Sequence, residues 1–557
     1  MAEHSQFGKL IVNNSNNRSL FGFELKFGDF PTQVTYSFSL MAHGDSASNS
    51  SFSCSLPNNP MLSRRTLIFT AVFLVCQYLL LTHFAQQCYQ PPSTVPALID
   101  SSISPSTIRD TNITIPLDTV RKTRHIAVAT TYGVHMDVYM SLAWTFQKVL
   151  DQSPSSRGSV EVYAPFPFIF DFHTVVEKLA LYRGEVKKPD ALIEAVNAGE
   201  IDVVVLGTCE IDLRSSWGED LLSAWDARDA AHKFTLVCIV HNGPEAAPKK
   251  TIEAFAQRRA IRIMAISDHV AASQKLAFLA RADSRDTTMR SAGYEYIPVD
   301  VHIPVLNVVL DTLRASESPR KMLSNAVIQG NFAHERRDYR NFFADLMKSL
   351  AEDPQVWGYL PLDRTANSTY LADPDLSEPP FQLFLVGSGT PIEVPHELQN
   401  IVHTRSRLKY TEFYALMNDM DIVIPAIPAT NIAYYDVKAS STFAIALECH
   451  VPILVTRRIR NSYTHIDDDR VAVTRPAAMT EVDALRALRT GKASLSVTGD
   501  AISENLKDMA REVENMIRRG WVRSAEDFQA VKAEIWRKNE HAVERILNEV
   551  LVIGGKR

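Results

Sequence analysis

Residues 434–456 read YYDVKASSTFAIALECHVPILVT, and this stretch decides the fold class of the chain. Its middle predicts a helix over Ser441–Glu448, and VPILVT at 451–456 is an apolar run without alternation. A helix that leads into such a run is typical of a parallel sheet covered by helices on both faces. The stretch therefore predicts one unit of a doubly wound α/β domain.

Both ends of this predicted helix carry side chains suited to binding a nucleotide. Ser440, Ser441 and Thr442 can cap its first turn, and the backbone amides there are then predicted to hold a phosphate. Glu448, at the other end, has a carboxylate suited to accept hydrogen bonds from both hydroxyls of a ribose. The alternative for Glu448 is an ordinary surface glutamate at a helix end.

The same alternation of apolar runs and helices occurs twice along the chain. In residues 320–500 the predicted strands are NAVIQGNF (325–332), FQLFLVGSG (381–389), IVHT (401–404) and DIVIPAI (421–427), with helices at 339–351 and 411–420. In residues 123–310 they are HIAVATT (125–131), VEVYAPF (160–166), IDVVVLGT (201–208), FTLVCIVHN (234–242), IRIMAISDH (261–269) and YIPVD (296–300), with helices at 136–150 and 191–198. The chain is therefore predicted to fold as two doubly wound, Rossmann-like domains that face a cleft. A linker is expected near 305–320, and two charged amphipathic helices within 501–557 are expected to brace the domains.

A different composition precedes these domains. Residues 67–85, LIFTAVFLVCQYLLLTHFA, hold no charged side chain, and Arg64 and Arg65 come just before them. This predicts a single transmembrane helix over 66–85 with the N-terminus in the cytosol, a type II topology. Residues 1–63, rich in Ser and Asn, are expected to form a disordered cytosolic tail. Residues 86–122, rich in Pro, Ser and Thr, are expected to form a stem, which places the domains in the lumen of the Golgi or endoplasmic reticulum.

Several polar residues follow predicted strands, at the edge where doubly wound sheets bind ligands. Gly330 follows the first strand of the second domain, and Arg336 or Arg337 can pair with diphosphate oxygens. The alternative for these arginines is a solvated helix face. In the first domain, Gly133 suits a turn that approaches a ligand on the acceptor side. His135 and His241 stand at strand ends, where they can act on a sugar or a phosphate.

These segments together resemble the group 1 glycosyltransferases of the GT-B fold (family 4-like). The resemblance lies in GNFAHERRDY at 330–339, in FLVGSG with Gly387, and in SSTFAIALECHVPILV with Glu448 and Pro452. It implies a donor site made of Gly330, Arg336, Arg337, Gly387, Ser440, Ser441, Thr442 and Glu448, in which Glu448 contacts the ribose. In families with an E-x7-E signature another glutamate stands eight positions earlier, and here that position is Ser440.

Charge and the remaining motifs exclude several classes of function. A formal net charge of -6 over 557 residues argues against a nucleic-acid binder with a basic surface. No CxxC or HExxH motif is present, and the D-x-D triplets at 373–375 and 419–421 are discounted as chance matches, so no metal or other cofactor is expected. Cys209 and Cys238 fall in predicted core strands and are expected to be free buried thiols.

The leading hypothesis is a membrane-anchored glycosyltransferase that moves a sugar from a UDP- or GDP-linked donor to a glycan or glycoconjugate acceptor. His135 and His241 are its candidate catalytic residues. Three alternatives stay open: a catalytically inactive relative that binds sugar nucleotides or glycans, a nucleotide-sugar epimerase or hydrolase, and a tethered structural module.

Overall fold

The structure is a computed structural model, and it falls into two compact units, residues 1–114 and 115–557. It describes residues 6–14, 17–25, 35–39, 51–55, 124–152, 158–230, 232–243, 248–308, 322–363, 368–492 and 504–553. The predicted membrane helix at 66–85 and the stem at 86–122 lie outside these residues. Within the described part of the chain, every helix is too short or too polar to cross a membrane.

The first unit contains strands where the sequence predicts a disordered tail. β1 (Gln6–Asn14) pairs antiparallel with β2 (Asn17–Leu25), and β3 (Thr35–Ser39) pairs with β4 (Ser51–Ser55). The prediction of disorder over 1–63 is therefore wrong for these segments. The Ser and Asn residues that indicated disorder are interleaved with Phe, Leu, Ile and Val, which favour strands.

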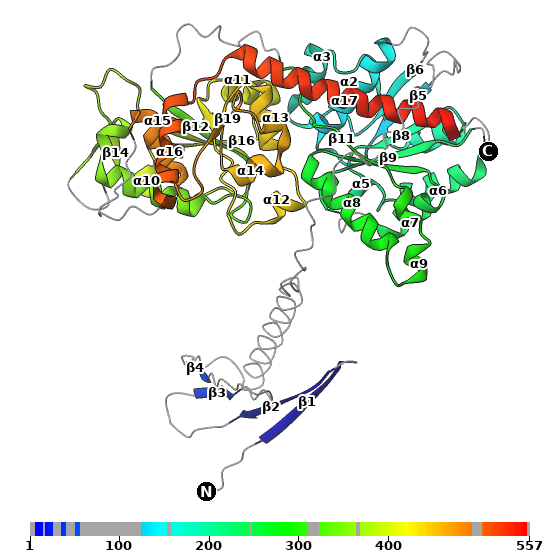
Figure 1. Ribbon diagram of the computed structural model, residues 1–557, viewed down its shortest axis with the longest axis horizontal. Helices are drawn as coiled ribbons and strands as arrows, with labels where there is room; N and C mark the ends of the chain where they lie inside the picture. Colours follow the sequence, from blue (N-terminus) through cyan, green and yellow to red (C-terminus); the bar gives the residue numbers. More distant parts are fainter. Residues whose placement is uncertain are drawn as a thin grey trace. The chain divides into compact units, whose positions relative to one another are not determined.

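The second unit begins with a lobe built on seven parallel strands in the order β11-β10-β9-β8-β5-β6-β7 (Figure 1). The strands are β5 (Arg124–Ala129), β6 (Gly158–Tyr163), β7 (Val186–Lys187), β8 (Val203–Leu206), β9 (Thr235–Val240), β10 (Ile261–Ala265) and β11 (Val299–Val301). The helices are α2 (Met136–Gln152), α3 (Phe172–Lys178), α4 (Ala191–Asn197), α5 (Cys209–Asp212), α6 (Trp217–Ala227), α7 (Lys249–Gln257), α8 (Asp268–Ala282) and α9 (Thr287–Arg290), with 3-10 turns η2 (Ile169–Asp171) and η3 (Tyr294–Tyr296). The central strands β8, β9 and β10 are buried on both faces, which accounts for their unbroken apolar runs.

A second lobe follows, with six parallel strands in the order β16-β15-β12-β17-β18-β19. The strands are β12 (Asn325–Phe332), β15 (Gln382–Gly389), β16 (Val402–Ser406), β17 (Ile422–Val423), β18 (Ile453–Val455) and β19 (Ala472–Thr474), and β13 (Tyr359–Pro361) pairs separately with β14 (Tyr370–Ala372). The helices are α10 (Tyr339–Glu352), α11 (Tyr410–Asn418), α12 (Ala433–Asp436), α13 (Ser441–Glu448), α14 (Arg457–Ser462) and α15 (Glu481–Thr490), with η4 (Pro354–Trp357), η5 (His396–Leu398) and η6 (Thr464–Ile466). The predicted architecture of two doubly wound domains is confirmed.

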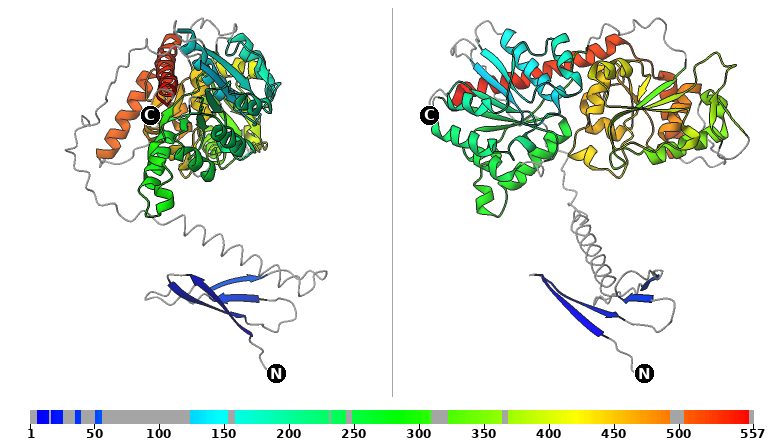
Figure 2. Two further views of the ribbon diagram at one scale, coloured as in Figure 1. Left: turned by 90° about the vertical axis from the view of Figure 1, so that its right-hand side faces the viewer. Right: turned by 180° about the vertical axis from the view of Figure 1, so that it is seen from behind.

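The two helices that follow the lobes differ in what they contact. α16 (Glu504–Arg519) buries Val513 and Met516 in the core of the second lobe. α17 (Ala525–Ile553) runs along both lobes, as the red helix of Figures 1 and 2 shows. Glu534 of α17 lies 2.9 Å from Arg470 of the second lobe, and Trp536 packs edge-on against Trp144 of the first. α17 therefore contacts both lobes, whereas the buried residues of α16 pack in the second lobe.

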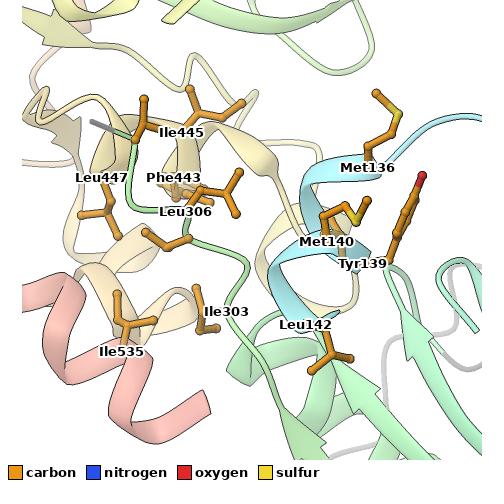
Figure 3. Packing of buried hydrophobic residues seen from close by; sticks show 14 of the residues in the cluster. Met136, Tyr139, Met140, Leu142, Ile303, Leu306, Phe443, Ile445, Leu447 and Ile535 are labelled. Atoms are coloured by element: carbon orange, nitrogen blue, oxygen red, sulfur yellow. The ribbon is translucent and has the colours of Figure 1, made fainter. Parts of the chain in front are cut away.

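One hydrophobic cluster crosses from lobe to lobe through the connecting residues 303–308. Figure 3 shows Leu306 beside Phe443 and Leu447 of α13, and Ile303 beside Ile535 of α17. α17 also binds the backbone of this segment, because Asn539 both accepts from the Ile303 amide at 3.0 Å and donates to its carbonyl at 2.8 Å. The connection between the lobes is therefore a packed and hydrogen-bonded strap over the residues that the structure describes.

Candidate functional site

A cleft of about 600 Å³ lies between the lobes, at the carboxyl ends of the strands of both sheets. In the first sheet the chain reverses its direction of winding between β5 and β8, and in the second between β12 and β17. Doubly wound sheets bind ligands at such switch points. The cleft is lined by the turns after β5, β8, β9 and β10 on one side. On the other side it is lined by the ends of β12, β15 and β16 and by the segment from α12 to the start of α13.

Most of the residues predicted for the site line this cleft. His135, His241, Gly330, Arg336, Arg337, Gly387, Ser440 and Ser441 do so. Gly133, Thr442 and Glu448 are not among the lining residues. The predicted site is therefore brought together in space except for these three.

Arg337 is the central cation of the second-lobe wall. Its side chain is 4% exposed, and its Nη2 donates to Thr442 Oγ1 at 2.8 Å and to the Gln329 carbonyl at 3.1 Å. Its Nε is buried without a hydrogen-bond partner, and among the described residues no carboxylate lies within ion-pair distance of it. Burial lowers the pKa of Arg337 below its usual value. A guanidinium held this way has no directly paired carboxylate and lies beside a cleft that can admit an anion.

Two glycines make room for Arg337 at the ends of adjacent strands. Gly330 of β12 has φ 138°, and a Cβ on it would lie 2.7 Å from Arg337 Nη2. Gly387 of β15 is its partner in the sheet, and a Cβ there would lie 1.7 Å from the Gly330 carbonyl oxygen. Any larger residue at either position would displace the guanidinium or the strand that carries it. These glycines thus keep the arginine close to the backbone, as well as opening the cleft.

The start of α13 differs in detail from its prediction. α13 begins at Ser441, with Ser440 as its N-cap, but no side chain caps its first turn. Ser440 instead donates to Thr442 Oγ1 at 3.1 Å, and Thr442 is fully buried beneath Arg337. Thr442 therefore positions the arginine, while the helix N-terminus keeps its preference for an anion.

Glu448 does not reach the cleft, so its predicted contact with a ribose is wrong for this structure. It is 1% exposed, its Oε1 accepts from the Leu306 amide at 2.8 Å, and its Oε2 accepts from the Tyr414 hydroxyl at 3.0 Å. Burial raises its pKa to about 8. Because α13 begins at the cleft, its last residue lies about 10 Å further away at 1.5 Å per residue. The α13 residues that do face the cleft beyond the first turn are Ala444 and Ile445.

The wall contributed by the second lobe is strongly basic. Among its lining residues are five cations and no carboxylate: Arg336, Arg337, Arg405, Arg407 and Lys438. Burial lowers the pKa of Lys438, and the nearby Arg336 adds to this effect. The chain's formal charge of -6 therefore hides a local positive field at this wall.

Two histidines face this wall from the first lobe. The rings of His135 and His241 stack with centroids 4.2 Å apart. Burial lowers the pKa of each to about 4, and for His135 the neighbouring His241 contributes as well. His241 donates from Nε2 to the Gly207 carbonyl at 3.1 Å. Both rings are therefore neutral near pH 7, a state in which an imidazole can accept a proton.

The turn that carries His135 is not shaped by Gly133. A Cβ on Gly133 would meet only Pro165 Cβ, at 3.9 Å, so the position does not require glycine. The left-handed residue of the turn is His135 itself, with φ 63°. Gly133 does not line the cleft and its position does not require glycine, so its acceptor-side role stays a prediction.

Two carboxylates of the first lobe were missed by the sequence prediction. Glu210 accepts from the His241 amide at 2.7 Å and the Asn242 amide at 3.1 Å, and Asp137 lies two residues after His135. Both line the cleft, and burial raises the pKa of both. Glu210 follows the turn after β8, so extending the strand-end rule to every strand would have found it.

The structure also shows the state of three cysteines and the role of one acidic triplet. Cys209 and Cys238 form a disulfide with Cα atoms 5.1 Å apart, so the prediction of free thiols is wrong for this pair, while Cys449 is a free buried thiol. Asp421 accepts from the amides of Ser324 and Asn325 at 2.7 and 2.8 Å, which gives the triplet 419–421 a structural role. In the described part of the chain, no group of three or more His, Cys, Asp or Glu is arranged to hold a metal ion.

Comparison with known proteins gives similarities of structure only. No family model matches the chain, and no curated protein matches its sequence. A pneumococcal O-GlcNAc transferase solved with UDP and GlcNAc is 13% identical, with 64% of this chain and 59% of that one covered and a TM-score of 0.34. WaaG, a glycosyltransferase involved in lipopolysaccharide biosynthesis, is 11% identical, with coverages of 78% and 100% and a TM-score of 0.32. S. aureus MnaA, solved with UDP, is 10% identical, with coverages of 73% and 94% and a TM-score of 0.35.

This chain thus spans about three fifths of the length of the pneumococcal transferase, since the match covers 59% of that protein.

Proposed function

We propose that this chain is a glycosyltransferase that moves a sugar from a nucleotide-diphosphate donor, UDP- or GDP-linked, to an acceptor hydroxyl. One observation carries the proposal. Arg337 is a buried guanidinium without a carboxylate within ion-pair distance among the described residues, next to the N-terminus of α13 and two strand-end glycines. This combination of donors suits a diphosphate, which presents several oxygens to a bidentate cation and to backbone amides.

The proposed reaction uses the basic wall of the second lobe and the neutral histidines of the first lobe. The acceptor hydroxyl oxygen forms a bond to the anomeric carbon of the donor sugar, while the bond from that carbon to the diphosphate oxygen breaks. His135, neutral because its pKa is lowered to about 4, takes the hydroxyl proton. The leaving diphosphate keeps the electron pair, and Arg337, Arg336 and the amides of α13 stabilise its charge.

A catalytically inactive sugar-nucleotide binder is the second candidate, and one observation favours it. The α13 residues that line the cleft are Ser441, Ala444 and Ile445, and none of them can replace a carboxylate. If the reaction needs a carboxylate on the donor side, this cleft binds the nucleotide without transferring its sugar.

We further propose that the lobes lie in the lumen of the secretory pathway, anchored by a helix over 66–85. The apolar run at 67–85 after Arg64 and Arg65 supports this topology. The disulfide between Cys209 and Cys238 supports an oxidising compartment, since such bonds are rare in the cytosol.

The test measures donor binding and sugar transfer separately on the full-length protein. UDP, GDP and their sugars are titrated by calorimetry, and turnover is followed with a panel of acceptors. We expect His135→Ala to keep donor affinity and to lower transfer by about 10²–10⁴-fold. His232→Ala is the matched control, because His232 is 61% exposed and lies outside the cleft lining. Binding without turnover would favour the inactive alternative, and the absence of nucleotide binding would reject both.

A further inference from the structure

The wall of the cleft contributed by the first lobe differs in charge from the basic wall. Its described lining residues contain no lysine or arginine. Its two carboxyls, Asp137 and Glu210, have pKa values raised by burial, and its two histidines have pKa values lowered to about 4. This wall is therefore neutral or negative near pH 7 and offers no charge to an anionic ligand.

The same wall exposes large apolar side chains. Of the 14 large hydrophobic residues that are exposed in the described chain, four line the cleft, and all four belong to the first lobe: Tyr132 (38%), Ile169 (39%), Phe170 (37%) and Ile211 (38%). Polar neutral side chains, among them Thr208, Asn242 and Ser267, lie on this wall as well. An exposed apolar group beside neutral hydrogen-bonding groups fits a ligand with an apolar face and a hydroxyl rim.

The loop that presents Phe170 is held in an unusual backbone conformation. Phe170 and Asp171 have φ values of 53° and 60°, in the left-handed region that residues with a side chain rarely adopt. Asp171 Oδ1 accepts a hydrogen bond from the Thr174 hydroxyl at 3.2 Å, and its Oδ2 lies 3.6 Å from Lys409 Nζ of the second lobe. Strained backbone that is held by its surroundings is typical of ligand-binding positions, so the orientation of Phe170 is imposed rather than incidental.

We infer that the first-lobe wall binds an uncharged carbohydrate acceptor, whose pyranose rings pack on Tyr132 and Phe170. The inference rests on the proposed function and narrows its acceptor class. A sugar ring has an apolar face that suits an aromatic side chain and peripheral hydroxyls that suit the neutral polar groups. A sialylated or phosphorylated acceptor, or an anionic lipid surface, would meet no cation on this wall.

The test uses full-length protein on immobilised glycans, each presented in a neutral form and in a sialylated or sulfated form, and on vesicles containing phosphatidylserine. We expect binding to neutral glycans, with about tenfold weaker binding for Tyr132→Ala and for Phe170→Ala. Tyr296→Ala is the matched control, since Tyr296 is 51% exposed in the same lobe but lies outside the cleft lining. Calorimetry with UDP on each variant shows that it is folded and keeps its donor site.

Preference for acidic glycans or for vesicles, binding to no neutral glycan, or equal loss in Tyr296→Ala would each overturn the inference. If the unmodified protein does not bind UDP, the proposed function is rejected. The comparison of neutral with acidic glycans then tests the first-lobe wall on its own.

Discussion

Replacing Arg337 with methionine separates a ligand-binding role from a structural one, because the two roles predict opposite results. In the structure Arg337 donates to Thr442, Ser440 and the carbonyls of Gln329 and Arg336. Hydrogen bonds from a charged donor contribute about 1.5–3 kcal/mol each, whereas a buried charge without an ion-pair partner costs several kcal/mol, so the two contributions largely offset each other. We therefore expect the free energy of unfolding of Arg337→Met to lie within about 2 kcal/mol of the unmodified protein, or above it.

The effect on nucleotide binding should be much larger. Two hydrogen bonds from a guanidinium to diphosphate oxygens contribute about 1.5–3 kcal/mol each, so UDP affinity should fall by about 10²–10⁴-fold. The assay combines calorimetric titration with thermal unfolding, in which UDP at about 100 times its Kd should stabilise the unmodified protein by about 2.7 kcal/mol. Arg340→Met is the matched control, because Arg340 is an exposed residue of α10 outside the cleft lining. If Arg337→Met unfolds readily yet retains UDP affinity, the arginine is structural and the reasoning is refuted.

Further predictions concern Gly330 and His135 of the cleft and the buried Glu448. Gly330→Ala should weaken UDP binding by about tenfold, because its Cβ would lie 2.7 Å from Arg337 Nη2, whereas Gly133→Ala should change nothing in the same titration. The pH profile of kcat/KM should stay flat well below pH 6.5 and fall near pH 4, because burial lowers the pKa of the base His135 to about 4; an acid limb between pH 6 and 7 would contradict its role. Glu448→Ala should lower the free energy of unfolding in urea by about 2–5 kcal/mol, because it leaves the Leu306 amide and the Tyr414 hydroxyl without a partner, and UDP affinity should be unchanged. Since burial raises the pKa of Glu448 to about 8, its neutral form stabilises the fold at low pH, and this contribution is lost as pH rises through about 8. Glu448→Gln should remove this dependence of the free energy of unfolding on pH.

Local sequence was enough to predict the elements that build the cleft. β12 and α13 begin and end at the predicted residues, because unbroken apolar runs and a hydroxyl-rich helix start are strong local signals. The strand-end rule also placed His135, His241 and Arg337 in one cleft, since parallel strands present their carboxyl ends at one edge.

The features that the sequence could not predict depend on which way a helix points and on contacts between residues far apart in the sequence. Spacing along α13 marks Glu448 as the helix end, but only the packed helix shows that its start faces the cleft and its end faces Leu306. The disulfide depends on the sheet order that puts β8 beside β9, so that Cys238 pairs with Leu206, three residues before Cys209. Sheet order is set by tertiary packing and leaves no local trace.

The strap between the lobes has a consequence for how the protein is made. Ile303, Val305 and Asn307 of the strap are bound by Asn539, Trp536 and Lys532 of α17, more than 200 residues later in the chain. During synthesis both lobes can fold as they emerge, because each has its own sheet and core. The strap gains these bonds only when α17 has been translated and has docked, whereas direct contacts between the lobes, such as His269 with the Lys438 and Ser462 carbonyls at 3.0 Å, do not need α17. A nascent chain can thus hold two finished lobes while the strap between them still lacks its three hydrogen bonds from α17.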